Sequence, residues 1–403
     1  MEVDRVIDDD AGRRAAAVHP QRERGGVHVV GPFAGATGHD RHTREFVRHL
    51  VRSGVPVQLT PLEGWSVPLP DGVRETRFDT LRAPVDAGIA LHFTMPTLCR
   101  PRAGAVNVNY TMFEADRIPR EWAVRAVEHE RIVVPTESSR LAWIAGGVAA
   151  EKLRVVPLAV DGDFFGAPAA PLDLTLANGR TLASYAHRFL NVADLRPRKN
   201  HLGLLRAWSA ATRSGDDAVL VLKCTSPHPR SLALFRQDVA EMQARCGRPL
   251  ERAAPVLFTT GMLGDEQLRS LYRAATHYVS MSCGEGWDFP MMESAAAGLQ
   301  LVAPAHSAYR EYLAADNAEL IPAALVPAAV EGRAGAEDRR WFDGACWWKP
   351  NEDAAADVIR RIVEGRAAPK ASPAERIIRT YRWDAAAARL EDVLYEPTRG
   401  APR

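Results

Sequence analysis

Residues 285–293 read EGWDFPMME and connect a short apolar run to a predicted helix. The preceding run, HYVSMSC (277–283), has the length and apolar character of a buried strand. Pro290 has the fixed φ that the first turn of a helix favours, and Gly298 is typical of a helix end, so MMESAAAG is predicted to be helical. Glu285 then lies in the strand-to-helix loop, and Glu293 lies about one turn into the helix.

Two carboxylates beside a helix N-terminus predict a site for a sugar nucleotide. The unpaired N–H groups and the positive dipole end of the helix favour a diphosphate at the loop. Glu285 can then accept hydrogen bonds from sugar hydroxyls, and Glu293 from ribose hydroxyls. Each acid also has a simpler interpretation, in which Glu285 caps the helix and Glu293 is an ordinary exposed helical residue.

A basic loop, RPRKN (196–200), follows another apolar strand earlier in the chain. A fixed cation beside a leaving diphosphate stabilises the negative charge that grows as the bond to the sugar breaks. Lys199 and Arg198 are the candidates for this role. The alternative is a solvated basic turn at a helix start, but its place upstream of the acid loop favours the functional interpretation.

The rest of the chain alternates apolar runs with helical stretches, which predicts two doubly wound parallel sheets of the Rossmann type. The Pro- and Gly-rich stretch 161–179 is typical of a connector. We therefore predict a flexible N-terminal arm (1–25), a first Rossmann-like domain on the acceptor side (26–170), a nucleotide-sugar-binding domain (171–375) and a C-terminal helix with a tail (376–403). The predicted strands are VHVVGPF, VPVQLT, DAGIALHF, AVNVNY, RIVVPT and KLRVVPL, then RFLNVADL, AVLVLKCT, PVLFTT, HYVSMS and LQLVAP.

Three segments, 131–165, 191–208 and 255–313, resemble the retaining nucleotide-sugar glycosyltransferases of family 4. The resemblance covers roughly residues 27 to 395. It implies two facing Rossmann-like domains, called the GT-B fold, with the final helix crossing back to the first domain. It also implies transfer of a sugar from a nucleoside diphosphate to a hydroxyl acceptor, such as a bacterial glycan or a natural product, with retention at the anomeric carbon.

The resemblance assigns roles to particular residues. It implies that Lys199 stabilises the diphosphate and that Glu285 orients the sugar. Arg196 or Arg198 supplies the second cation, and we favour Arg198. Two positions depart from the family, because Asp194 stands where an arginine is frequent, and Tyr110 and Thr111 stand where many relatives have a histidine. The donor-binding candidates are Glu293, Gly38, Gly286, Trp287, Asp288 and Phe289, and the acceptor-side candidates are Tyr110, Thr111 and Glu114.

The composition excludes several classes of function. The chain has 51 Lys and Arg against 50 Asp and Glu, which argues against nucleic acid as the main partner. Its five cysteines are scattered and form no C-x-x-C pair, so we expect a reducing cytosol, and no segment is typical of a signal peptide or a membrane span. We expect no cofactor and no metal: the D-x-D pair Asp161 and Asp163 lies in the connector, and His92 at a strand end is expected to serve packing.

Other interpretations stay open. A GT-B subunit that binds a sugar nucleotide or a partner protein without turnover would accommodate Asp194 and the missing histidine. A nicotinamide-dependent oxidoreductase shares the sheets, but the loop GPFAGATG departs from G-x-G-x-x-G. Peripheral membrane contact is a further alternative, because the next helix carries Arg41, Arg44, Arg48 and Arg52. The oligomeric state is left open.

Overall fold

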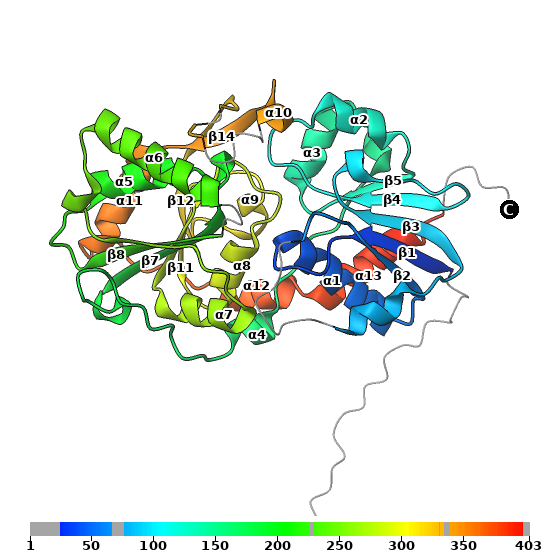
Figure 1. The fold of residues 1–403 in the computed structure, drawn as a ribbon, viewed down its shortest axis with the longest axis horizontal. Coiled ribbons are helices and arrows are strands. Elements are labelled where there is room, and N and C mark those ends of the chain that lie inside the picture. Colours follow the sequence, from blue (N-terminus) through cyan, green and yellow to red (C-terminus); the bar gives the residue numbers. More distant parts are fainter. Residues whose placement is uncertain (1–24, 67–75, 226–228, 330, 334–338, 398–403) are drawn as a thin grey trace, which may run out of the picture.

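Two lobes lie side by side in the computed structural model (Figure 1). The structure describes residues 25–66, 76–225, 229–329, 331–333 and 339–397. The predicted flexible arm therefore lies outside the described residues except for its last position.

The first lobe contains a six-stranded parallel sheet in the order β2-β1-β3-β4-β5-β6. Helix α1 packs against β1, β2 and β3, and α3 packs against β5 and β6. The strands are β1 (Gly26–Gly31), β2 (Val57–Pro61), β3 (Ala87–Phe93), β4 (Val106–Tyr110), β5 (Arg131–Val134) and β6 (Leu153–Val155), and the helices are α1 (Gly38–Arg52), α2 (Arg120–Ala126) and α3 (Glu137–Ala145).

The second lobe contains a parallel sheet of six strands in the order β12-β11-β10-β7-β8-β9. The strands are β7 (His187–Asp194), β8 (Ala218–Thr225), β9 (Val256–Thr259), β10 (His277–Val279), β11 (Gln300–Pro304) and β12 (Glu319–Ile321). The helices are α4 (Gly162–Gly166), α5 (His201–Ala211), α6 (Pro229–Cys246), α7 (Asp265–Ala274), α8 (Phe289–Ala296), α9 (Tyr309–Tyr312), α10 (Arg339–Phe342) and α11 (Glu352–Val363).

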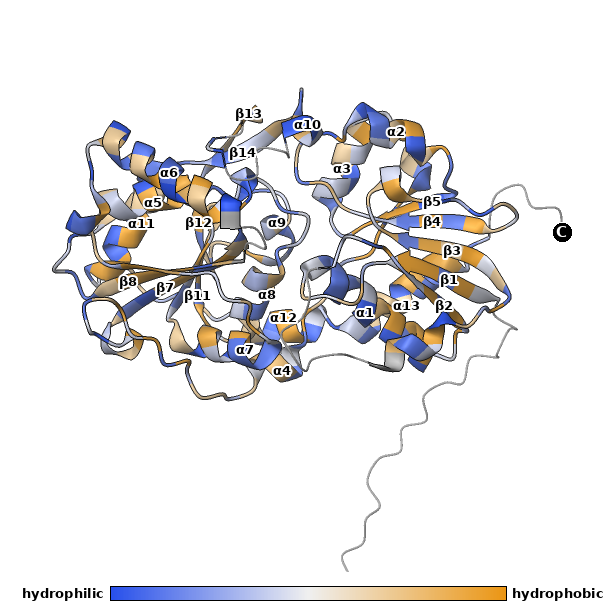
Figure 2. Ribbon diagram, viewed as in Figure 1, coloured by the Kyte–Doolittle hydropathy of each residue, from blue (hydrophilic) through white to orange (hydrophobic). Residues whose placement is uncertain are grey.

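The prediction of two Rossmann-like parallel-sheet domains is confirmed, since every predicted apolar run contains a strand. Figure 2 shows why, because apolar residues gather on the strands and on the helix faces turned toward them. Several strands are shorter than the predicted runs, such as β6, which ends at Val155, and β10, which ends at Val279. After β10 the chain turns, with Ser282 Oγ donating to the Gly284 carbonyl (3.0 Å). Strand β12 and the hairpin of β13 (Ala323–Pro327) and β14 (Cys346–Pro350) were not predicted.

The β13–β14 hairpin and α10 lie at the top of Figure 1, between the two lobes. The Asp116 N–H of the first lobe donates to the Cys346 carbonyl at 2.9 Å, and Asp116 Oδ1 accepts from the Cys346 N–H at 2.6 Å. The Phe113 ring of the first lobe and the Phe342 ring of α10 stack at 5.4 Å. The hairpin therefore contributes hydrogen bonds between the lobes, and α10 contributes an apolar contact.

The end of the chain lies on the first lobe. Helices α12 (Ala374–Thr380) and α13 (Trp383–Leu394), drawn in red in Figure 1, follow the second lobe, and α13 packs along α1. The Trp383 ring meets Phe46 edge-on at 5.6 Å and lies 6.0 Å from the Phe289 ring of the second lobe. Trp383 thus contacts both lobes.

Arg44 and Arg48 of α1 are engaged within the protein. Arg44 donates to the carbonyls of Phe33 (2.8 Å) and Gly35 (2.5 Å), and Arg48 pairs with Glu45. Among the described residues, none of the helices combines the length and the apolar character needed to cross a bilayer. An α1 that binds an anionic membrane would need these arginines free, so their contacts weaken the membrane alternative.

Replacing Leu390 of α13 with Ala should lower the free energy of unfolding by about 2–5 kcal/mol, because the side chain is fully buried and its loss leaves a cavity. Urea unfolding followed by circular dichroism measures the change. Leu141→Ala on α3 is the matched control, since Leu141 is 54% exposed and its loss should change stability by less than about 0.5 kcal/mol. Equal effects of the two substitutions would contradict the packing of α13.

Candidate functional site

Glu285 is the centre of the site, and it lies in the loop between β10 and α8 with only 4% of its surface exposed. Lys199 Nζ lies 2.6 Å from its Oε1, and Arg198 Nη1 lies 3.0 Å from its Oε2. The structure therefore brings the basic loop and the acid loop together, 86 positions apart in the chain. The three side chains form a buried cluster of two cations and one anion.

The cations keep the Glu285 carboxylate ionised. Burial alone would raise the pKa of this carboxyl, but Arg198 and then Lys199 overcome that effect and lower it to about 2. The carboxylate is thus a hydrogen-bond acceptor at neutral pH. Arg198 also pairs with Glu114 of the first lobe at 3.5 Å, so the two cations face two acids.

Backbone geometry at Asn200 holds the basic loop in place. Asn200 has the left-handed φ of 53°, and its side chain caps α5 by accepting from the Gly203 N–H (3.2 Å). Its Nδ2 donates to the Met281 carbonyl (3.0 Å), and the Cys283 N–H donates to the Arg198 carbonyl (2.8 Å). These bonds join the two loops before any ligand is present, which is the preorganisation a binding site needs.

Asp288, and not Glu285, is the N-cap of α8. Its φ is 69°, its carboxylate accepts from the Met291 N–H (3.4 Å), and the Tyr309 hydroxyl donates to Oδ2 (2.7 Å). Burial raises the pKa of Asp288 to about 6, and the nearby Glu285 adds to the effect. The proposed alternative for Glu285, helix capping, therefore does not hold.

Glu293 is buried on α8 and is not an exposed helical residue. The Tyr272 hydroxyl donates to its Oε2 at 2.7 Å, and Arg41 of the first lobe forms an ion pair with Oε1. Arg41 also pairs with Asp265 at 2.6 Å. Helix α1 of one lobe is thereby tied to α7 and α8 of the other.

Two glycines allow the lobes to approach at the acid loop. A Cβ on Gly284 would overlap the Glu114 carbonyl, and a Cβ on Gly286 would lie 2.6 Å from Met112 Sδ. Glu114 also lies 3.5 Å from Arg198 across the same contact. The loop 112–114 of the first lobe is therefore a direct neighbour of the site in the second.

Beside this contact, the first lobe has a cavity of about 80 Å³. Thr111 and Glu114, both predicted on the acceptor side, are part of its wall, whereas the Tyr110 hydroxyl points away and donates to the Val156 carbonyl in the core. The wall consists of His39, His42, Trp65, Thr94, Met95, Tyr110, Thr111, Met112, Glu114 and Trp122. Sequence reasoning missed His39 and Trp65, whose rings meet edge-on at 5.7 Å, although His39 directly follows the predicted Gly38.

Two other predicted donor residues differ in position: Gly38 faces the other lobe, and Trp287 is buried. Gly38 begins α1 and faces the other lobe, since a Cβ there would lie 3.2 Å from the Phe289 ring. The Trp287 indole is buried between the rings of Tyr312 (5.6 Å) and Tyr381 (5.4 Å), so it supports the loop from behind.

Two charged positions lie apart from the buried cluster. Asp194 and Arg196 form a half-exposed pair at 3.5 Å. Asp161 caps α4 by accepting from the Phe164 N–H (3.0 Å), which explains one acid of the D-x-D pair without a metal.

Part of the second lobe matches a known protein family. Residues 186–333, most of the second lobe, match the family described as glycosyl transferases group 1. A sequence comparison with curated proteins gave no match.

Solved structures share the whole fold. HepE from Anabaena, solved with UDP and glucose, is 12% identical with a TM-score of 0.61, over 93% of this chain and 100% of its own. Sucrose-phosphate synthase from Thermosynechococcus elongatus is 14% identical with a TM-score of 0.64, over 92% and 98%. A glycosyltransferase from Rickettsia africae is 14% identical with a TM-score of 0.56, over 94% and 100%. The fold is thus the GT-B architecture.

The raised pKa of Asp288 predicts a pH-dependent penalty on stability. The folded protein holds an extra proton at this carboxyl between about pH 4 and pH 6, so stability falls as pH rises through that window. Asp288→Asn keeps a good N-cap but carries no charge. Relative to the wild type, this variant should gain roughly 1–3 kcal/mol as pH rises from 4 to 7, measured by urea unfolding.

Asp161→Asn is the control, because it makes the same change at an exposed N-cap. The gain of Asp288→Asn over this pH range should exceed that of Asp161→Asn, because Asp288 is buried and Asp161 is exposed. Equal gains for the two variants would contradict the raised pKa of Asp288.

Proposed function

We propose that the protein is a retaining glycosyltransferase that moves a sugar from a nucleoside diphosphate to a hydroxyl acceptor in the cleft between its lobes. The observation that carries the proposal is the buried cluster of Glu285, Lys199 and Arg198 beside the N-terminus of α8. Two preorganised cations at a helix N-terminus are suited to a diphosphate. The match of the second lobe to group 1 glycosyl transferases supports the same chemistry.

Donor binding would redistribute the charges of this cluster. Lys199 and Arg198 now neutralise Glu285, and an arriving diphosphate offers them a second anion. As these cations turn toward the phosphates, the carboxylate becomes free to accept hydrogen bonds from sugar hydroxyls. During bond cleavage the leaving diphosphate gains negative charge, and the same cations stabilise it more than they stabilise the ground state. We propose that cations and the helix end fulfil this role without a metal.

Glu293 would hold the ribose, provided that Arg41 releases it. In the structure Arg41 crosses the cleft and occupies Oε1, while Tyr272 occupies Oε2. Opening of the lobes would separate Arg41 from Glu293 and expose an acceptor for the ribose hydroxyls. The Anabaena neighbour was solved with UDP-glucose, which supports a nucleotide sugar as the ligand of this fold.

The acceptor would bind on the side of the first lobe, at the cavity with Thr111, Glu114 and His39 in its wall. No described residue combines a strong nucleophile with a place beside Glu285, which agrees with a mechanism in which the departing phosphate takes the acceptor proton on the same face. Such a mechanism retains the configuration at the anomeric carbon. The free, scattered cysteines support a cytosolic location for the reaction, and a bacterial glycan or natural product remains our proposal for the acceptor.

A subunit that binds a sugar nucleotide or a partner without turnover is the second candidate. Asp194 favours it, because this acid stands at the end of β7, beside the basic loop, where a second cation would help the leaving group. Turnover assays separate the two candidates.

Thermal unfolding with UDP, GDP, ADP and dTDP tests the donor site. A ligand at about a hundred times its dissociation constant adds roughly 2.7 kcal/mol to stability, so one nucleotide should raise Tm clearly. UDP is the first to test, because it is bound in the Anabaena structure. Glu293→Gln should reduce the shift by weakening the ribose contact. Failure of all four nucleotides to raise Tm would contradict the donor site.

Glu285→Gln should lower the transfer rate by about 100-fold or more while the circular dichroism spectrum stays native, since the amide keeps the shape but loses the charge that orients the sugar and its two cations. The readout is release of nucleoside diphosphate with an acceptor mixture. Glu375→Gln is the matched control, because the Glu375 side chain is 91% exposed. Equal turnover of Glu285→Gln and wild type would refute the assigned role.

A further inference from the structure

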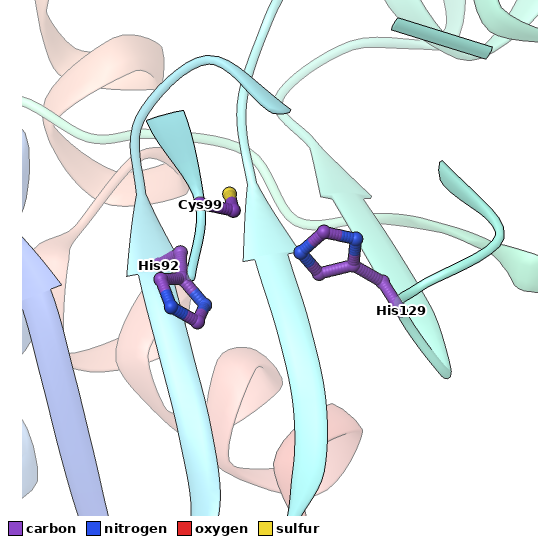
Figure 3. Close-up of side chains that lie close together, drawn as sticks. All are labelled: His92, Cys99 and His129. Carbon is purple, nitrogen blue, oxygen red and sulfur yellow. The ribbon is translucent and has the colours of Figure 1, made fainter. Parts of the chain in front are cut away.

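Three potential metal ligands converge in the first lobe, away from the acid loop (Figure 3). His92 lies on β3, Cys99 directly follows the short 3-10 helix Pro96–Leu98, and His129 lies between α2 and β5. One ligand atom from each side chain, a ring nitrogen or the sulfur, lies within 4.8 Å of the other two. All three residues are buried, with exposed fractions of 1%, 3% and 1%.

Both histidines have one ring nitrogen without a hydrogen-bond partner. Nδ1 of His92 and Nε2 of His129 are buried and unpaired. The other nitrogen of each ring faces a backbone carbonyl: His92 Nε2 lies 3.1 Å from the Arg100 oxygen, and His129 Nδ1 lies 3.2 Å from the Arg125 oxygen.

The Arg125 carbonyl assigns the tautomer of His129. Its Nδ1 must carry the proton and donate it, so Nε2 has a bare lone pair. His92 Nε2 faces both the Arg100 carbonyl (3.1 Å) and the Arg100 N–H (3.4 Å), and a metal on Nδ1 would select the tautomer in which Nε2 donates to the carbonyl. A histidine that binds a metal with one nitrogen and donates the other N–H to a backbone carbonyl has this arrangement. An unpaired buried polar atom costs about 1–3 kcal/mol, and this cluster has two.

We propose that His92, Cys99 and His129 bind a structural Zn²⁺ ion. Two imidazoles and a thiolate suit zinc, whereas Mg²⁺ and Ca²⁺ require oxygen ligands. Zinc bonds of about 2.0–2.3 Å place neighbouring ligand atoms roughly 3.3–3.8 Å apart, so the present cluster contracts by about 1 Å on binding. A water completes the tetrahedral coordination.

The ion fastens segments that end at the proposed acceptor cavity. Thr94 and Met95, which separate His92 from the 3-10 helix, are part of the cavity wall, as is Trp122 of α2. Cys99 follows that 3-10 helix, and His129 follows α2. Zinc therefore joins both segments to β3 and holds Thr94, Met95 and Trp122 of the cavity wall in place, without contact with the donor. The proposal holds whether or not the chain transfers sugars.

Metal content is the first test. The full chain, purified without a metal-affinity step, should contain about one zinc per chain by elemental analysis. Replacement by Co²⁺ should give the visible bands of a tetrahedral site and a thiolate-to-cobalt absorption in the near ultraviolet. Cys99→Ser should lose that absorption, and His129→Gln should lower the metal content.

Cys224→Ser is the matched control, because Cys224 is equally buried and lies 3.5 Å from a single histidine, His201. It should keep both the zinc and the cobalt spectrum. Equal spectra for Cys99→Ser and Cys224→Ser would overturn the proposal.

A second test uses the wild type alone, so that a variant that fails to fold does not obscure the result. Removal of metal with a strong chelator should lower Tm by several degrees, and Zn²⁺ but not Mg²⁺ should restore it. A chain that contains no zinc as purified and whose Tm does not respond to chelator or zinc would overturn the proposal.

Discussion

The ion cluster around Glu285 is the interaction on which the site depends. A buried carboxylate is costly unless cations and hydrogen bonds compensate it, and here Lys199 and Arg198 do so from a loop on a neighbouring strand. The cluster therefore joins β7 and β10 at the edge where both strands end. It also keeps two cations and one acceptor at fixed positions beside a helix N-terminus, which is the charge distribution that a diphosphate sugar requires.

The close packing of the two lobes depends on two glycines and on one ion pair between the lobes. Gly284 and Gly286 allow the backbone of the first lobe to reach the acid loop, because any side chain there would collide with Glu114 or Met112. Arg41 then closes the opposite side by pairing with Glu293. The structure thus represents a closed arrangement, in which the groups proposed for the donor are satisfied by the protein itself.

Much of the fold was predictable because apolar runs of strand length are local signals, and the helix at Pro290 was predictable for the same reason. The sequence also predicted that Lys199 and Glu285 belong to one site, because the basic loop and the acid loop occur in the expected order along the chain. Long-range contacts had no such signal: nothing in the sequence pairs Arg41 with Glu293, and His92 was expected to serve packing alone. Which groups are left unpaired depends on tertiary packing, so the sequence could not indicate the orphaned nitrogens.

The position of α13 has a consequence for synthesis. The core of the first lobe needs Trp383 against Phe46, but more than two hundred residues of the second lobe are translated between the end of β6 and this helix. At about 5–20 residues per second, the part of α1 that α13 covers stays exposed for roughly 10–50 s on the ribosome. The amino-terminal lobe therefore acquires its last helix only after the second lobe has been made, and until then the contact of Trp383 with Phe46 is missing.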